Sequence, residues 1–418
     1  MRRGRLYIIS MKKIFYKISN IFYTLFLFSA ATLFAQTGSA NLSVSRTGPY
    51  KVVDKSNWSR YENGKYIGHV YREVRASITP QPGSGESSLL YRGNFYVLEE
   101  TLRDMVQSAR GLDAVIPVTF EMFKSGGIEI DNDRGFPALR GFPSYPAGMV
   151  LPGTKWTAPG AQALDPLNTG RPVLVPFFAE YEYRGIETYR EEPVHRIQAR
   201  YAIRFRGDGE ILTISGTHTV DILVRVSDGL PRMMRDSMDE TYTFPDGKTL
   251  RFRGFTLSFG ESSVPLDREA VIASIPRTDL EKIPPAGSGS GLEALPDIEV
   301  ESVPEGIKLT LKDLRFAPDS DQLLPEEKPR LEQIAQVLKN IPGRDFLVEG
   351  HTASVGNVKG EMELSVQRAK KIVDELSARG IPPDRFIFKG WGGTKPVGDN
   401  GTDEGRKLNR RVEITILE

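Results

Sequence analysis

The residues best suited to binding chemistry lie between positions 350 and 368. The segment Gly350–Gly356 reads GHTASVG, which is typical of a strand that ends in a shaped loop. Downstream, Glu361, Leu364 and Arg368 fall at i, i+3 and i+7 of a predicted helix, so they share one face. An arginine fork binds a carboxylate through two parallel hydrogen bonds, and a helix N-terminus favours an anion through its free N–H groups. The pattern predicts an anion-binding site in which Ala353 stands where a charged contact is expected.

The elements that position these residues alternate between strand and helix. Apolar residues recur at helical spacing in 325–340 and again in 361–380, where the second run ends at a glycine. Strands are predicted at 307–316, 346–352, 385–391 and 410–417. The order β-α-β-α-β-β predicts a two-layer α/β sandwich for residues 300–418.

Five short motifs in this part occur in the order and spacing of one family. They are F-x-x-D-S (316–320), G-H-T-x-x-x-G (350–356), L-S-x-x-R-A (364–369), K-G-x-G (389–392) and N-R-R-V-E-I (409–414). Residues 300–418 therefore resemble the OmpA-like peptidoglycan-binding domain. The resemblance implies non-covalent binding of the stem peptide of peptidoglycan, without catalysis, metal or cofactor. The ligand-binding positions that we expect from it are Asp319, Thr352, Ala353, Glu361, Leu364, Arg368 and Arg411.

The match at this site is partial. In the family, an aspartate directly after His-Thr takes the ammonium of diaminopimelate, and the arginine of L-S-x-x-R-A takes a carboxylate. Here Arg368 is present, but Ala353 holds the aspartate position and Glu361 holds that of a family asparagine. Three interpretations stay open. Either the site is retuned to ornithine, with Glu361 receiving the ammonium, or it is lost and Glu361 pairs with Arg368, or diaminopimelate still binds weakly through Arg368 and backbone groups.

The N-terminus and the composition indicate an exported protein. A basic stretch precedes the apolar run 21–35, which ends in small residues; this is typical of a secretory signal and short for a membrane-spanning helix. We therefore expect residues 1–35 to be a signal peptide. The chain of 418 residues has no cysteine, which excludes disulfides and thiolate metal sites. A net charge of +1 without a basic run argues against a nucleic-acid partner.

Residues 41–282 are predicted to form an antiparallel β-rich region, as a meander, half-barrel or sandwich, in one domain or two. Apolar and polar residues alternate in 195–205, and Asp-Gly pairs at 208–209, 228–229 and 246–247 separate apolar runs. These features predict a meander over about 173–259. The segment 96–109 is expected to be helical, and the Pro-, Gly- and aromatic-rich block 136–156 shows no pattern. The run PPAGSGSG predicts a linker over 283–299.

Together these features predict a non-enzymatic envelope protein, since no nucleophile elbow, phosphate loop or dinucleotide motif is present. We expect it in the periplasm, bound to peptidoglycan and associated with the outer membrane. There it would tether the β-rich region to the wall. A second partner that we consider is another envelope protein, bound through the β-rich region. Two alternatives remain. The OmpA-like domain has lost wall binding and is a structural or protein-interaction module, or the β-rich region is an outer-membrane barrel with a periplasmic wall anchor.

Overall fold

The computed structural model describes residues 38–45, 48–82, 87–99, 109–167, 169–275, 298–312, 314–317 and 320–418. The expected signal peptide and Asp319 lie outside these ranges, as does the expected linker except for its last two residues, which begin a strand. Within the described ranges, no helix has both the length and the apolar character needed to cross a membrane.

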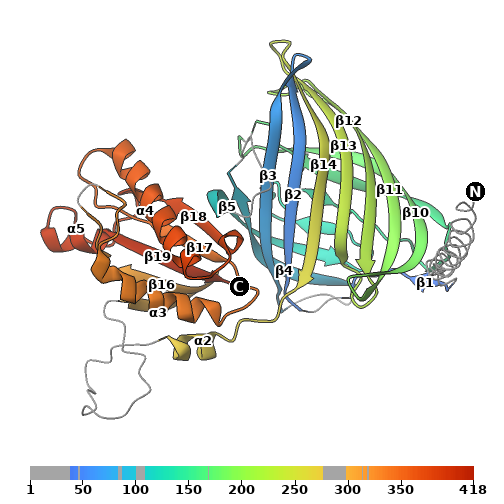
Figure 1. The fold of residues 1–418 in the computed structure, drawn as a ribbon. Helices are drawn as coiled ribbons and strands as arrows, with labels where there is room; N and C mark the ends of the chain where they lie inside the picture. Colours follow the sequence, from blue (N-terminus) through green and yellow to red (C-terminus); the bar gives the residue numbers. More distant parts are fainter. Residues whose placement is uncertain are drawn as a thin grey trace, which may run out of the picture.

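One large antiparallel sheet forms the N-terminal region (Figure 1). Its strands are β2 (Tyr50–Glu62), β3 (Lys65–Pro80), β4 (Ser88–Leu98), β5 (Arg110–Phe123), β6 (Ile128–Ile130), β7 (Leu139–Arg140), β9 (Lys155–Leu164), β10 (Val173–Tyr189), β11 (Glu192–Arg206), β12 (Thr213–Arg225), β13 (Pro231–Thr243) and β14 (Thr249–Ser262). They pair in the order β7-β9-β10-β11-β12-β13-β14-β2-β3-β4-β5-β6. Because β14 returns to pair with β2, the sheet curves around an interior. The short strands β1 (Ala40–Asn41) and β8 (Met149–Val150) pair separately.

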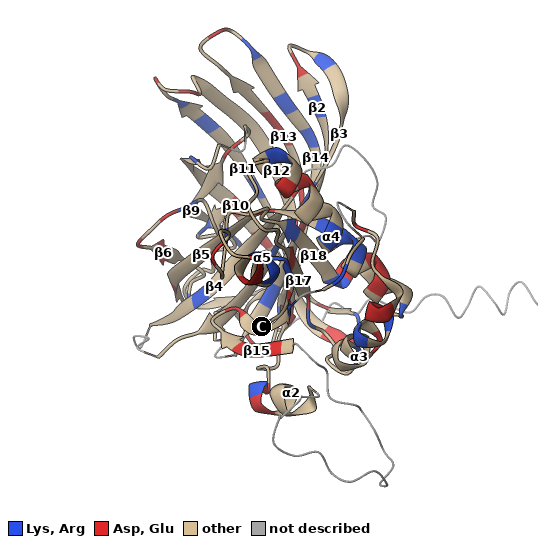
Figure 2. Cartoon of the chain, turned by 90° about the vertical axis from the view of Figure 1, so that its left-hand side faces the viewer, with Lys and Arg blue, Asp and Glu red and all other residues tan. Residues whose placement is uncertain are grey.

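Alternation along the strands separates the interior from solvent. In β10, Phe177, Tyr181 and Tyr183 are buried, whereas Phe178 and Glu180 between them are exposed. Charged residues of both signs recur along the long strands (Figure 2). The predicted meander is confirmed in β10–β14, and the predicted β-rich N-terminal region is confirmed as a whole. The helix expected at 96–109 is wrong in its first turn, because Tyr96 to Leu98 complete β4; residues 100–108 lie outside the described ranges.

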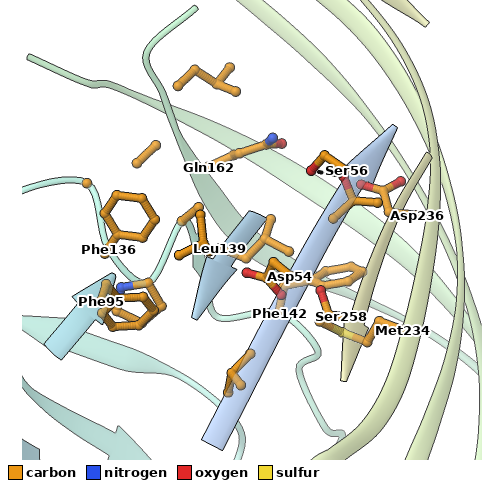
Figure 3. A pocket seen from close by; sticks show the side chains of 18 of the residues that line it. Asp54, Ser56, Phe95, Phe136, Leu139, Phe142, Gln162, Met234, Asp236 and Ser258 are labelled. Carbon is orange, nitrogen blue, oxygen red and sulfur yellow. Dashed lines mark hydrogen bonds between the residues drawn. The ribbon is translucent and has the colours of Figure 1, made fainter. Parts of the chain in front are cut away.

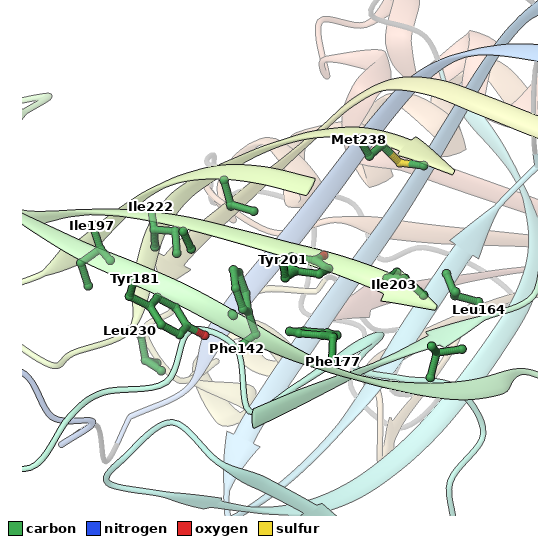
Figure 4. Packing of buried hydrophobic residues seen from close by; sticks show 14 of the residues in the cluster. Phe142, Leu164, Phe177, Tyr181, Ile197, Tyr201, Ile203, Ile222, Leu230 and Met238 are labelled. Carbon is green, nitrogen blue, oxygen red and sulfur yellow. The ribbon is translucent and has the colours of Figure 1, made fainter. Parts of the chain in front are cut away.

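Side chains of the block 136–156, which showed no pattern in the sequence, pack against the inner face of the curved sheet. Phe142 lies between Tyr181 and Tyr201, with ring centroids 5.6 and 5.4 Å away (Figure 4). The Tyr145 hydroxyl donates to the carbonyl of Gly229 at 2.7 Å. This segment has no periodicity because it packs as an irregular insertion, so neither the helical nor the strand pattern applies to it.

The C-terminal domain has the predicted two layers. Its elements are β15 (Ile298–Val303), β16 (Gly306–Lys312), a 3₁₀ turn η1 (Pro325–Glu327), α3 (Lys328–Lys339), β17 (Phe346–Gly350), α4 (Val358–Ala378), a 3₁₀ turn η2 (Pro383–Arg385), β18 (Phe386–Gly390), α5 (Asp403–Asn409) and β19 (Arg411–Leu417). The sheet order is β15-β16-β19-β17-β18, with only β17 and β18 parallel. Buried apolar residues of α3 and α4 pack on one face of it. Strand β15 and helix α5 were not predicted.

The other face of this sheet meets the N-terminal region. Strand β5 pairs in parallel with β18 at its edge, and Leu347 and Ile387 pack against Tyr96 and Leu98 of β4. Polar contacts reinforce this junction: Lys389 Nζ donates to the Asp113 carbonyl at 2.8 Å, and Lys51 Nζ to the Gly343 carbonyl at 2.9 Å. Before the undescribed segment, the short helix α2 (Arg268–Ser274) also reaches the C-terminal domain, through the ion pair of Arg268 with Glu418 at 2.7 Å. The two parts therefore share an apolar and hydrogen-bonded interface.

Candidate functional site

Helix α4 is held close to the sheet by motif residues with no room for larger side chains. A Cβ at Gly350 would lie 2.2 Å from the Ser365 carbonyl oxygen, and one at Gly390 would lie 2.3 Å from Ser365 Oγ. Ser365 is fully buried, and its hydroxyl accepts a hydrogen bond from the Gly392 N–H at 2.8 Å. The glycines of G-H-T and K-G-x-G thus set the approach of the helix that carries Glu361 and Arg368.

We expect Gly350→Ala to destabilise the protein by about 1–3 kcal/mol, the usual range for overpacking a tight core. The added methyl group meets a backbone oxygen, which cannot move without shifting α4. Chemical denaturation would measure the loss. Gly209→Ala is the matched control, since a Cβ there meets nothing within 4 Å, and it should leave the midpoint nearly unchanged. An equal stability of Gly350→Ala and the parent would contradict this account.

Glu361 organises the loop that precedes α4. Its Oε1 accepts hydrogen bonds from the backbone N–H groups of Val355, Gly356 and Asn357, at 2.7, 3.1 and 3.2 Å. Asn357 caps the helix by accepting from the Gly360 N–H. Glu361 is only 7% exposed, so these N–H groups compensate a nearly buried carboxylate. The loop conformation therefore depends on Glu361.

Three further predicted residues lie at or beside this loop. Ala353 is buried, and it presents a methyl group instead of a carboxylate. The Thr352 hydroxyl is buried and has no hydrogen-bond partner among the described residues, although the Thr352 N–H donates to the Gly392 carbonyl at 2.9 Å. Leu364 is half-buried one turn after Glu361. Glu361 Oε2 makes no hydrogen bond to a described residue, so this carboxylate keeps one oxygen that a ligand can engage.

Arg368 is oriented by the F-x-x-D-S motif. Its Nε donates to the Ser320 carbonyl at 3.1 Å, and its guanidinium carbon lies 4.8 Å from the centroid of the Phe316 ring. Among the contacts of the described residues, no ion pair joins it to Glu361, so the mutual neutralisation considered from the sequence is not seen. The structure places Arg368 and Glu361 on the same helix with different immediate partners.

Arg411 belongs to a separate polar cluster. Its Nε donates to Glu413 at 2.7 Å, and Lys308 Nζ reaches the same carboxylate at 3.0 Å. Burial, with the nearby Arg411 charge, lowers the pKa of His351 to about 3, so this imidazole is neutral. The described contacts join Arg411 to Glu413 and to the Lys395 carbonyl, not to Glu361 or Arg368. A place for Arg411 in the ligand site stays a prediction.

Two asparagines that the sequence analysis did not assign to the site hold the neighbouring loop. Asn409 is fully buried, and its Oδ1 accepts from the N–H groups of Val397 and Gly398 at 2.7 and 2.8 Å. Its Nδ2 donates to Asn400 Oδ1, which in turn accepts from the Ser354 N–H at 3.0 Å. The sequence motif N-R-R already pointed to Asn409, because Asn409 is its first residue and makes the hydrogen bonds that join these loops.

The sequence model of the OmpA family matches residues 315–410. Over 103 residues the chain is 37% identical to "Peptidoglycan-binding protein ArfA" of Mycobacterium tuberculosis, covering 25% of this chain and 32% of that one. It is 38% identical over 105 residues to "Outer membrane protein A" of Bordetella avium, covering 25% of this chain and 54% of that one. The chain thus spans about a third to a half of the length of these relatives.

A solved structure of the peptidoglycan-associated lipoprotein from Burkholderia pseudomallei is 27% identical, with 25% of this chain and 88% of that chain covered and a TM-score of 0.24. The family match spans the F-x-x-D-S loop, the G-H-T loop and α4. Residues 315–410 are therefore an OmpA family domain, which this chain carries behind a large β-rich N-terminal region.

Proposed function

We propose that this protein is exported to the periplasm and binds peptidoglycan non-covalently through the loop 351–357 and the adjoining face of α4. The observation that carries the proposal is the joint placement of Glu361, which orders the loop, and Arg368, which is oriented by the F-x-x-D-S motif. The printed name of the M. tuberculosis relative, a peptidoglycan-binding protein, supports the same ligand class. A binding role also agrees with a site built from hydrogen-bond donors and acceptors.

We further propose that the site prefers a stem peptide with ornithine over one with diaminopimelate. Ornithine keeps the side-chain ammonium but lacks the distal carboxylate. Glu361 accepts the loop hydrogen bonds through Oε1, which leaves Oε2 as an acceptor that suits an ammonium. Ala353 offers no carboxylate for the zwitterion that the family aspartate recognises. Arg368 would then take another carboxylate of the stem peptide.

The test is co-sedimentation of the intact protein with purified sacculi of the two wall types. We expect saturable pelleting with ornithine-type sacculi and weaker pelleting with diaminopimelate-type sacculi. Equal pelleting with both would overturn the preference, and pelleting with neither would favour a domain that serves only as a structural or protein-interaction module.

Ala353→Asp should raise the affinity for diaminopimelate-type sacculi by roughly tenfold, since a charge-assisted hydrogen bond contributes about 1.5–3 kcal/mol. The substitution restores a carboxylate at a buried position beside Thr352. Binding curves with both wall types would measure the change, with Ala353→Asn as the uncharged control of similar size. An unchanged affinity in both variants would show that position 353 does not face the ligand.

The junction between the two parts supports a role in positioning. Strand β5 continues the C-terminal sheet, and apolar residues of β4 pack on its open face. Wall binding by the C-terminal domain would therefore hold the β-rich region in a defined orientation, and not only at a certain distance as a flexible tether would.

A further inference from the structure

The curved sheet lines a partly open cavity of about 570 Å³, which lies within the usual range for small-molecule pockets. Its walls come from β2, β3, β4, β5, β13 and β14, and from the inserted block 126–145, which overlaps the block 136–156. In Figure 3, Phe136 lies on the opposite side of the view from Asp236, with Leu139, Phe142 and Asp54 between them. The lining therefore combines apolar side chains of this block with acidic side chains of the strands.

The polar side is set by the register of neighbouring strands. Ser56 of β2 pairs with Thr256 of β14, and Thr256 pairs with Asp236 of β13. The Ser56 and Thr256 hydroxyls lie 3.0 Å apart. In the next row, Asp54 pairs with Ser258. Inward-facing polar residues at matched positions of adjacent strands thus form one continuous strip.

Acidic groups dominate the charges that face this cavity. Those contributed by the described lining are Asp54, Asp113, Asp165, Asp236 and Glu240, against Arg72 and Arg134. The buried His218 bridges two of the acids, with its Nδ1 2.8 Å from Asp236 and its Nε2 3.1 Å from Glu240. One oxygen of Asp236, Oδ1, is nonetheless buried without a hydrogen-bond partner among the described residues.

Aromatic rings line the cavity farther along the same strands, four or more residues from Asp54 and Asp236. Trp58 and Tyr242 both line the cavity and contact Phe252, with ring centroids 5.8 and 6.0 Å apart. Carboxylates recognise a cation by charge, and the faces of aromatic rings attract it through their quadrupole. The apolar side chains of the inserted block suit an alkyl or ring system, because they remove its surface from water.

We propose that this cavity binds an amphiphile with an ammonium headgroup, whose charge lies against Asp54 and Asp236 and whose apolar body lies against the inserted block. This site is separate from the wall-binding loop, so either proposal can fail alone. Burial raises the pKa of Asp54 from 3.8 to about 6, although Ser258 and Arg72 oppose the rise. A bound cation would relieve that penalty.

The experiment is calorimetric titration of the intact protein with dodecylamine, dodecanol and dodecanoate, each below its micellar concentration at pH 7.5. The three probes share one chain and differ only in the head. We expect saturable binding of dodecylamine, with dodecanol at least about tenfold weaker and dodecanoate weaker still. Dodecanoate or dodecanol binding as tightly as dodecylamine would overturn the proposal, as would no saturable binding of any probe.

Two variants locate the site. Asp54→Asn and Asp236→Asn should each weaken dodecylamine binding about tenfold. Glu180→Gln is the control, because its side chain is 71% exposed on the outer face and pairs with Arg200 at 3.7 Å; it should bind like the parent. Unchanged affinity in Asp54→Asn would contradict the placement of the headgroup.

For Asp54→Asn, a measurement of stability separates loss of binding from misfolding. The Asp54 carboxyl holds its proton more tightly in the folded state than in the unfolded state. Its ionisation therefore lowers the stability of the protein as pH rises from about 4 to about 6, and the full loss persists above pH 6. The variant should therefore unfold at a higher denaturant concentration than the parent at pH 7.5, and at the same concentration near pH 4. Weaker binding by a more stable protein cannot be attributed to misfolding. Arg72, Asp236 and Glu240 are the other charged groups that line this part of the cavity, and the fully buried His218 contacts Asp236 and Glu240.

Discussion

Arg368→Ala should lower the affinity for ornithine-type sacculi by at least about tenfold, and by up to about a hundredfold. Hydrogen bonds to a charged partner contribute about 1.5–3 kcal/mol, and the guanidinium offers two of them in a fixed geometry. Arg368 already stands in place, with its Nε bound to the Ser320 carbonyl and its plane beside Phe316. The loss is therefore expected in binding, measured from the fraction of protein that pellets with increasing amounts of sacculi.

Because Arg368 also contacts Phe316 and Ser320, stability must be measured beside binding. Arg368→Lys retains the charge but not the fork, so it should recover only part of the affinity. Lys370→Ala removes an exposed cation from the same helix and should bind like the parent. Parent-like pelleting by a folded Arg368→Ala protein would show that the stem peptide is not bound here.

The C-terminal domain was predictable because its fold is encoded locally. Helices α3 and α4 and strands β17, β18 and β19 follow patterns of apolar residues that a window of the sequence reveals. The motif glycines can be read from the sequence, but the need for glycine is seen only in the structure. Gly350 and Gly390 leave room for Ser365, which is distant in the sequence. Helix α5 was missed because it is a short polar turn held by the Thr402 cap, without an apolar face.

The N-terminal region was predictable in class and not in architecture. Long alternating strands such as β10 and β11 are clear, whereas β5 contains Pro117 and begins at the junction with another sheet. Phe142, in the block 136–156, is buried through contacts with Tyr181 and Tyr201, which follow it by dozens of residues, so no local pattern predicts its position. The same holds for the cavity, since its polar strip exists only once β2, β13 and β14 are in register.

At the candidate binding site, the sequence predicted Glu361 and Arg368, and the structure shows which groups they bond to. Glu361 and Arg368 share a helix face as predicted. The spacing that suggested an ion pair between them could not show that the loop N–H groups would take the carboxylate first. Competition between backbone donors and a distant guanidinium depends on the loop conformation, which one sequence does not specify.

The second large effect is expected at the junction of the two parts, where Glu73 is buried among cations. Its carboxylate accepts from Arg75 Nε at 2.7 Å and from the Tyr71 hydroxyl at 3.0 Å, and Arg110 Nε lies 3.6 Å away. Arg75 also reaches Asp345 of the C-terminal domain, at 3.3 Å. Burial by itself would raise the pKa of Glu73, but the Arg75 charge and hydrogen bond outweigh it and hold that pKa below the ordinary value.

Glu73→Ala should therefore destabilise the protein by about 3–5 kcal/mol at neutral pH, the range for breaking a buried ion pair from one side. Arg75 and Arg110 would stay in a low-dielectric junction with less negative charge to compensate them. Because the folded-state pKa of Glu73 is depressed, its contribution is present above the unfolded pKa and lost as pH falls through the folded one. The difference between variant and parent should accordingly shrink on acidification below about pH 4.5.

Thermal and chemical unfolding at pH 7.5 and pH 3.5 would test this, with Glu180→Gln as the control for an exposed ion pair, where about 0–1 kcal/mol is expected. Glu73→Gln keeps a hydrogen-bond acceptor without the charge, so its stability should fall between those of Glu73→Ala and the parent. Since Arg75 joins Glu73 to Asp345, the loss should also loosen the junction, and the single unfolding transition of a coupled protein should separate into two. A fully stable Glu73→Ala protein with one transition would mean that the apolar contacts of Leu347 and Ile387 are sufficient to hold the β-rich region on the C-terminal domain.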